Sequence, residues 1–510
     1  MTPFLDALTR VPPLLAHHVL LAAAALLLGI AISVPLAVWS ARRPAVARVA
    51  FGLASLVQTV PALALLALFF PLLLAIGLPA LGFLPALLAL TLYAVLPILR
   101  NGVAGLNGLD PAVIEAADAV GMTSAQKLRL VEAPLVAPVL IAGIRTAAVW
   151  TIGAATLSTT VGAPSLGDLI FAGLQTQNWA LVLAGCVAAA GLALAADALI
   201  GAVEHGIARR RRAWWLGGLV ALVAGTALAT LPLWRAPADR PIVIGAKNFS
   251  EQYILARLIG DRLTSAGYQV EYRDGLGSAV IFGALSSGAV DVYVDYGGTL
   301  WANEMHRTDV VPAATMVPAI GRWAQAQHGV RLLGALGFEN AYAFAMRGDA
   351  ARRRGIRTLD DLAAQSPQLT LGSDLEFLER PEWRAVRAAY PMRFAKAVPY
   401  SPTFMYRALA SGDADAVTAF SSDGRIAADR LTVLTDTRHA LPRYDALLLV
   451  GPAHAHDQRF AAALQSLVGH IPVEAMREAN YRVDRDAAKQ SPEQAAAWLA
   501  ARLRPQTRSP

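Results

Sequence analysis

The chain has 510 residues, which is more than one ordinary domain holds and enough for two or three. Hydrophobic residues make up 55% and charged residues 16%, and because a soluble globular chain carries about 25% charged residues, part of this chain is expected to lie in lipid. The net charge of +7 is mild and spread along the chain, which argues against a nucleic-acid surface, and the single cysteine excludes an intrachain disulfide.

The first half contains long uncharged stretches that predict six membrane-spanning helices, because a span needs about 20 mostly apolar residues. The stretch 49–99 carries no formal charge and is long enough for two spans with a turn near 77–79. The predicted spans are 19–41, two within 49–99, 138–160, 178–203 and 213–234. Arg145 and Asp197 are the ionisable residues deepest in their spans, and they either pair or extend toward the interface.

Lys and Arg alternate between the loops that join these spans. The loops after the first, third and fifth spans contain basic residues, whereas the loops 71–84 and 161–177 contain none. The positive-inside rule therefore places the amino terminus and everything after residue 235 outside the cytoplasm. The arginines 209–212 before an apolar run also resemble a signal peptide with a cleavage site at 227–229, but the length of the run favours an uncleaved anchor.

The cytoplasmic loop 110–140 has the pattern of two short helices separated by a turn. Pro111 can open a helix over 112–119, Gly121 permits a sharp turn, and a second short helix is expected to end near Val131. The spacing resembles the EAA loop of ABC importer permeases, which docks into a cytoplasmic ATPase, although an ordinary amphipathic loop is the alternative. The residues that match the motif are Glu115, Ala116, Ala117, Gly121 and Pro134.

The chain contains no G-x4-G-K-[ST] phosphate loop. The resemblance therefore implies that a separate cytoplasmic ABC ATPase subunit hydrolyses ATP. It also implies that two copies of this chain form a homodimer in the membrane.

After residue 241, short apolar strands alternate with helical stretches, which predicts a mainly parallel α/β sheet. About 270 residues suit two α/β lobes with a cleft between them. The expected divisions are a transmembrane domain at 1–212, a sixth span or anchor at 213–235 and an outer domain at 236–510, with lobe I at about 241–342 and 445–510 and lobe II at about 343–444.

Four segments of the outer half resemble the osmoprotectant-type binding proteins. They read GAKNFSEQYILARL, GLGSAVIFGALSSGAVDVYVDYGGT, NAYAFAMR and FSSDGRI. The resemblance implies a two-lobed α/β domain of the periplasmic binding-protein type II, joined to an α-helical domain like an ABC importer permease. It also implies a quaternary amine ligand such as glycine betaine, choline or carnitine, and fusion of the two halves is known in that family.

A quaternary ammonium has no N–H to donate, so a site holds it by aromatic faces, and a carboxylate tail needs Lys, Arg or backbone donors. The resemblance carries over these ligand-binding positions: Lys247, Tyr296, Asn340, Tyr342, Arg380 and Tyr406. Asp429 stands where the family has a fourth tyrosine, five residues after Gly424. A carboxylate there either pairs with the cation or indicates a different ligand.

Import of a quaternary amine by a multi-pass protein of the bacterial inner membrane is the function that these observations favour. Ergothioneine importers share the fused layout and carry a trimethylammonium amino acid, so they are the main alternative. A transmembrane sensor is less favoured, because it needs a cytoplasmic output domain. The sequence has no clustered metal ligands, G-x-S-x-G elbow or nucleophile triad, so we expect no catalytic residues, metal or cofactor.

Overall fold

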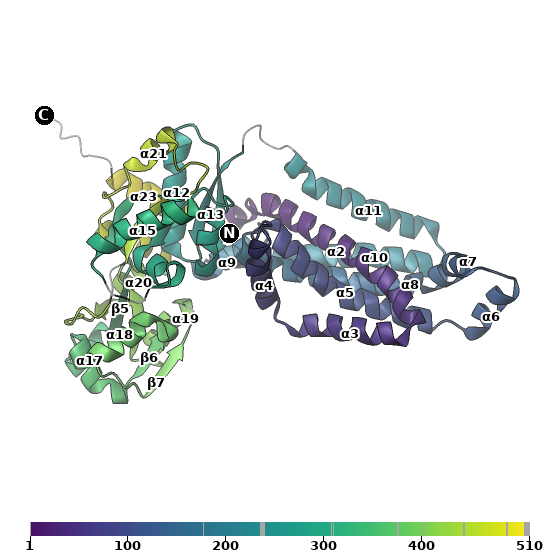
Figure 1. Ribbon diagram of the computed structural model, residues 1–510, viewed down its shortest axis with the longest axis horizontal. Coiled ribbons are helices and arrows are strands. Elements are labelled where there is room, and N and C mark those ends of the chain that lie inside the picture. Colours follow the sequence, from purple (N-terminus) through teal and green to yellow (C-terminus); the bar gives the residue numbers. More distant parts are fainter. Residues whose placement is uncertain are drawn as a thin grey trace. The chain divides into compact units, whose positions relative to one another are not determined.

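The computed structural model describes residues 2–176, 178–234, 240–307, 309, 311–374, 377–400, 402–441, 444–485 and 488–503. The chain divides into two compact units (Figure 1), the first comprising 1–173 and 179–238 and the second 174–178 and 239–510. The first unit is helical, and the second contains both sheets.

Apolar helices dominate the first unit. Its helices are α1 (Thr2–Leu8), α2 (Val11–Arg42), α3 (Pro44–Thr59), α4 (Ala62–Ala75), α5 (Phe83–Asn107), α6 (Pro111–Ala119), α7 (Ser124–Lys127), α8 (Ala133–Ala155), α9 (Gly167–Gln175), α10 (Trp179–Ala208) and α11 (Arg212–Thr230). Within the described residues, five continuous helical segments are long and apolar enough to cross a membrane, and a sixth candidate is a bent pair. The six-span expectation is therefore confirmed at the level of five to six apolar helices.

The second predicted span is not one straight helix. It consists of α3 and α4, which meet at an angle of 103°. The break follows from Pro61, because proline lacks an N–H and disfavours helical backbone at the residue before it, and α3 ends at Thr59. An uncharged stretch thus gives the length of a span but not its straightness.

The loop 110–140 contains the two predicted helices, with one difference. The first is α6, which begins after Asp110, whose side chain accepts a hydrogen bond from the Ala112 N–H at 2.9 Å. The second does not end near Val131, because α7 continues through a π-helical turn, Leu128–Glu132, directly into α8. The π turn lies just before Pro134, whose ring and missing N–H disturb an α-helical ladder.

Arg145 on α8 and Asp197 on α10 form an ion pair. Arg145 Nε donates to Asp197 Oδ1 at 2.5 Å and Nη2 donates to Oδ2 at 2.7 Å, while Nη1 lies 3.5 Å from a Glu204 oxygen. Of the two alternatives that the sequence left open, pairing is the one observed. Two parallel bonds fix the guanidinium in one geometry and join the two helices.

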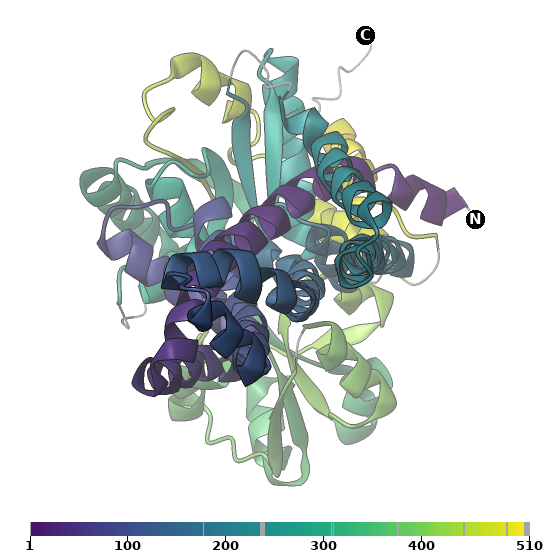
Figure 2. The same cartoon turned by 90° about the vertical axis from the view of Figure 1, so that its right-hand side faces the viewer.

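The second unit contains two five-stranded sheets, one in each lobe (Figure 2). The first sheet has the order β2-β1-β3-β10-β4 and the second has the order β7-β6-β8-β5-β9. The strands are β1 (Ile242–Lys247), β2 (Val270–Leu276), β3 (Val292–Tyr296), β4 (Arg331–Glu339), β5 (Tyr342–Arg347), β6 (Thr370–Ser373), β7 (Lys396–Pro399), β8 (Ala416–Phe420), β9 (Leu431–Val433) and β10 (Asp445–Val450).

The expectation of mainly parallel sheets is wrong, because both sheets are mixed. Strands β1, β2 and β3 pair in parallel, as do β6, β7 and β8, but β10 runs antiparallel to β3 and β4, and β5 runs antiparallel to β8 and β9. The antiparallel strands β4, β5 and β10 are those where the chain passes between the lobes. Among the described residues of these passages, which leave out 442–443, there is no crossover helix, the element that makes neighbouring strands parallel.

Helices flank the sheets and form their cores. The longer ones are α12 (Ser250–Ser265), α13 (Ser278–Ser286), α15 (Ala313–His328), α16 (Gly348–Arg354), α17 (Leu359–Gln365), α18 (Pro381–Ala389), α19 (Pro402–Ser411), α20 (Gly424–Ala428), α21 (Gln458–Gln465), α22 (Val473–Asp484) and α23 (Pro492–Arg502). In α12 the apolar residues Ile254, Leu255, Leu258 and Ile259 are buried, so the helix packs on the first sheet and fixes its own first turn beside the end of β1.

Candidate functional site

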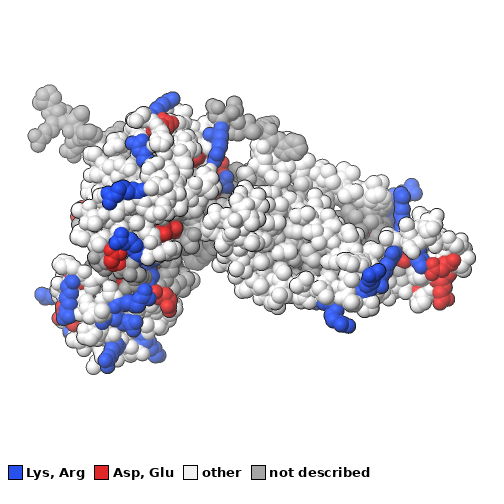
Figure 3. Space-filling view, viewed as in Figure 1, with Lys and Arg blue, Asp and Glu red and all other residues white. Residues whose placement is uncertain are grey.

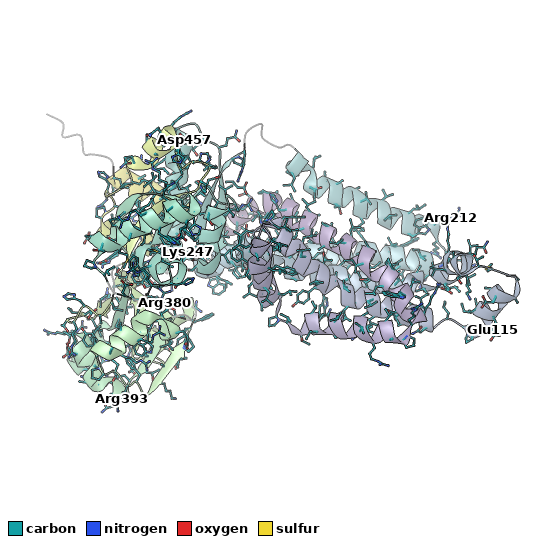
Figure 4. The ribbon with its side chains drawn as sticks, viewed as in Figure 1. Glu115, Arg212, Lys247, Arg380, Arg393 and Asp457 are labelled. Atoms are coloured by element: carbon teal, nitrogen blue, oxygen red, sulfur yellow. The ribbon has the colours of Figure 1, made fainter. Side chains whose placement is uncertain are left out.

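A cavity of about 250 Å³ lies in the second unit where the two lobes meet. Its wall comes largely from segments at the carboxyl ends of β1, β3, β6 and β8, which is where ligands bind in open α/β sheets. Figure 4 places Lys247 and Arg380 in this region. The aromatic side chains of the wall are Phe249, Tyr296, Tyr342, Phe420 and Tyr444. Its charged side chains are Lys247, Arg380, Arg425, Glu251, Asp374, Asp423 and Asp484.

Lys247, the last residue of β1, lines the cavity but is buried at 1% exposure. Its Nζ pairs with Asp295, which is equally buried, and Tyr293 donates a hydrogen bond of 2.6 Å to the other oxygen of Asp295. The same ammonium lies 5.6 Å from the ring centre of Tyr296. The charge of Lys247 is therefore already balanced within the protein.

Tyr296 ends β3, and its hydroxyl points at a carboxylate from α12. The hydroxyl donates to Glu251 Oε1 at 2.6 Å and accepts from Gln252 Nε2 at 3.0 Å. Asn340, in the crossing from β4 to β5, donates to the same Glu251 oxygen at 3.1 Å. Burial raises the pKa of Glu251 and of Tyr296 above their ordinary values. Two predicted residues thus meet around a glutamate that the prediction did not include.

Tyr342 begins β5 and lies among aromatic rings. Its ring centre is 4.8 Å from those of Phe377 and Phe420 and 6.0 Å from that of Tyr444. The Arg380 guanidinium lies 5.5 Å from the same ring centre. Arg380 donates from Nε and Nη2 to the two oxygens of Glu382, each at 3.1 Å, so this predicted cation also has an acidic partner.

Two predicted residues lie outside the wall of the cavity. Tyr406 is buried on α19, with the Arg425 guanidinium 5.0 Å from its ring centre. Asp429 is exposed just after α20, whereas Asp423 at the start of this five-residue helix lines the cavity. The helix separates the two carboxylates, so the one that lines the cavity is the helix-capping Asp423 and not Asp429. Contact of Tyr406 and Asp429 with a ligand stays a prediction.

Glu251, Asn480 and Asp484 are wall residues that the sequence did not indicate. Asn480 Nδ2 donates to Glu251 Oε2 at 2.8 Å, and Ser250 donates to Asp484 at 2.6 Å. An acidic residue in the first turn of a helix has an ordinary explanation in the helix dipole, so Glu251 gave no signal of its own. Asn480 and Asp484 come from α22, more than 220 residues after Glu251 in the chain. The sequence alone does not show that they lie in the same cavity wall.

The loop that resembles an ATPase-docking segment is exposed. Glu115 and Ala116 lie at the surface of α6, Ala117 is buried, and Gly121 turns the chain with φ at +78°. Val120 and Leu130 expose 72% and 61% of their surface. Lys, Arg, Asp and Glu gather around α6 and α7, whereas the flank of the long helices is almost free of them (Figure 3).

Each of the two units matches a known protein family. Residues 240–501 match the family model "Substrate binding domain of ABC-type glycine betaine transport system". Residues 33–209 match "Binding-protein-dependent transport system inner membrane component". The fold and site therefore define an importer permease joined to its solute-binding domain. The chain belongs to the ABC-type glycine betaine transport family, as a fusion of permease and binding protein.

Individual relatives cover one or both units. The ergothioneine transport permease/ergothioneine binding protein EgtU of Helicobacter pylori is 29% identical over 84% of this chain and 78% of its own. The choline transport system permease protein OpuBB of Bacillus subtilis is 40% identical over 37% of this chain and 84% of its own. A solved structure of a glycine betaine/carnitine/choline ABC transporter is 24% identical, covers 51% of this chain and 98% of its own, and superposes with a TM-score of 0.46.

Proposed function

We propose that this chain imports a small trimethylammonium compound of the glycine betaine, choline or carnitine type. The observation that carries the proposal is the cavity, whose wall combines five aromatic side chains with more acidic than basic groups. Aromatic faces attract a quaternary ammonium, which cannot be bound through N–H donors. A surplus of carboxylates favours a ligand that carries a positive charge.

Ergothioneine is the second candidate. It also contains a trimethylammonium group, so the same wall suits it. The match to the Helicobacter pylori ergothioneine protein extends over both units, whereas the match to the choline permease extends over the first alone. A binding measurement therefore has to distinguish glycine betaine, choline, carnitine and ergothioneine.

The transport cycle also needs an energy source and a complete pore. We propose that a separate cytoplasmic subunit hydrolyses ATP and docks on the α6–α7 loop, and that two copies of this chain form the membrane-spanning part. The solute-binding unit then lies outside the cytoplasm, in agreement with the alternation of basic loops, and hands its ligand to the permease.

The test is calorimetric titration of the full-length protein in lipid nanodiscs with glycine betaine, choline, carnitine and ergothioneine. We expect one of them to bind with a dissociation constant in the micromolar range or below. If none of the four binds, the trimethylammonium assignment is wrong and the importer family alone remains.

A further inference from the structure

Glu251 is a buried carboxylate in the cavity wall whose hydrogen-bonding partners are all neutral. It is 3% exposed, and it accepts from the Tyr296 hydroxyl at 2.6 Å, from Asn340 at 3.1 Å and from Asn480 at 2.8 Å. Within the part of the chain that the structure describes, no Lys or Arg is paired with it. A buried charge held only by neutral donors lacks the opposite charge that such a group normally has.

The basic groups of the wall already have acidic partners. Lys247 pairs with Asp295, and Arg380 pairs with Glu382. Arg425 interacts electrostatically with Asp423 and Asp484. The basic groups of the wall are thus engaged with other acids, and the content of the cavity is the remaining source of a positive charge beside Glu251.

The geometry around Glu251 holds the carboxylate in one orientation. Tyr296 is a wall of the cavity and binds Glu251 through its hydroxyl, so the aromatic face and the carboxylate are fixed relative to each other. Asn340 lies between the two lobes and Asn480 on α22, so the hydrogen bonds come from three separate parts of the unit. A carboxylate fixed beside an aromatic face presents two kinds of attraction to the same cation.

We infer that Glu251 is the counter-charge for the ammonium group of the ligand and thereby selects charged over neutral solutes. The inference rests on the proposed function, since it assumes that the ligand carries a trimethylammonium group. It adds a specificity-determining residue that lies one position after the start of α12, outside the set of aromatic walls.

Proton linkage follows from this assignment. Burial raises the pKa of Glu251 in the empty cavity, and a cation placed beside it lowers that pKa again. Binding then releases protons at pH values between the two, and affinity rises with pH through this range and levels off above it. The other charged groups of the cavity wall are Asp484 on α22, Arg425 on α20 and Asp423 just before it, Asp374, Arg380 with its partner Glu382, and Lys247 with its partner Asp295.

The first experiment compares two Glu→Gln variants of the full-length protein in nanodiscs, using the same four compounds. Glu251→Gln removes the charge and keeps the shape, and Glu474→Gln makes the same change at an exposed position on α22. We expect Glu251→Gln to weaken binding at least about 30-fold, as loss of a buried charge partner does. Glu474→Gln should stay within about twofold. Affinity of Glu251→Gln within about twofold of wild type overturns the inference and leaves the proposed function in place.

The second experiment needs no variant, because Glu251→Gln places an amide against the Asn480 amide and can disturb folding. Wild-type protein is titrated at pH 5 to 8 in two buffers with different enthalpies of protonation. A heat that depends on the buffer reports proton release and supports the inference. Equal heats in both buffers at every pH contradict it. If none of the four compounds binds wild type, both the proposed function and this assignment are wrong.

Discussion

Lys247, which lines the cavity, forms an ion pair with Asp295, and 1% of each residue is exposed. Motif position alone placed Lys247 against the ligand, and it does line the cavity. Because its charge is balanced by Asp295, the lysine supports the wall and the ring of Tyr296 rather than offering an unbalanced charge to a carboxylate. This relationship makes the pair a determinant of stability.

Lys247→Met should destabilise the solute-binding unit by about 3–5 kcal/mol, since it leaves the Asp295 charge buried without its partner. The measurement is the Tm of that unit's unfolding transition in the full-length protein. Adding Asp295→Asn should restore part of the loss, because the unpaired charge is then gone. Lys396→Met, at an exposed position on β7, serves as the control and should leave the Tm unchanged. A Tm for Lys247→Met equal to that of the control contradicts the argument.

Replacing the Tyr342 ring should weaken binding, whereas removing its hydroxyl alone should not. Tyr342→Ala deletes an aromatic face from the wall and should reduce affinity by about 30-fold, in line with a desolvated cation–π contact of about 2 kcal/mol. Tyr342→Phe retains the face and should bind within about threefold of wild type. Tyr268→Ala removes a tyrosine that is not part of the wall, so it should not change the titration. Equal losses for Ala and Phe indicate that the hydroxyl, not the ring, recognises the ligand.

The sequence predicted the two kinds of domain because both signals are long-range averages. Uncharged stretches and the alternation of basic loops extend over tens of residues, so small errors in boundaries do not change the result. It did not predict the break between α3 and α4, because Pro61 lies in a stretch whose hydropathy is high on both sides. It also did not predict that β10 runs antiparallel to β3, because strand direction depends on where the chain passes between lobes.

The site was harder to predict than the fold. Motif position placed Tyr296, Asn340 and Tyr342 in the wall, since each ends, follows or begins a strand that its sheet holds in place. Glu251 and Asn480 carry no local signal, and their importance depends on a contact between positions 229 residues apart. Asp423 and Asp429 lie at opposite ends of a five-residue helix. Motif spacing does not show which end of such a helix faces the cavity.

The pair formed by Arg145 and Asp197 should make the helical unit sensitive to single but not double substitution. Arg145→Met leaves Asp197 and Glu204 without their cation, and Asp197→Leu leaves the arginine without its bidentate partner. Each should lower the Tm of the helical unit, because an unpaired charge in a span is costly. The double variant should be more stable than the sum of the two losses predicts. Additive losses in this double-mutant cycle contradict a direct pair.

Asp484 should make the stability of the binding unit fall as pH rises in the acidic range. Burial raises its pKa from 3.8 to about 6, so the folded protein holds a proton that the unfolded chain has already lost. Between these values the native state binds more protons, and its stability therefore decreases as pH increases. Asp484→Asn should flatten the dependence of Tm on pH over this range, and a residual slope from Glu251 should remain. Asp413→Asn, at an exposed position, should reproduce the wild-type curve.

Gly121 separates α6 from α7 with φ at +78°, and nothing lies within 4 Å of the position where a β-carbon would stand. Gly153 in α8 has equally open surroundings without the positive φ, so it is the control for adding a methyl group without backbone strain. An L-residue in the left-handed region costs about 1–2 kcal/mol. Gly121→Ala should therefore shift the geometry of the α6–α7 loop, whereas Gly153→Ala should be tolerated.

Gly121→Ala tests whether the α6–α7 loop docks on the ATPase, because ligand binding and transport can be measured separately. Uptake by whole cells of the compound identified in the titration should fall several-fold, because the loop no longer presents its two helices to the ATPase in the required orientation. Affinity measured in nanodiscs should stay at the wild-type value, since the cavity lies in the other unit. If uptake by Gly121→Ala equals that of Gly153→Ala, the turn is not needed for coupling. The loop is then an ordinary connection between spans.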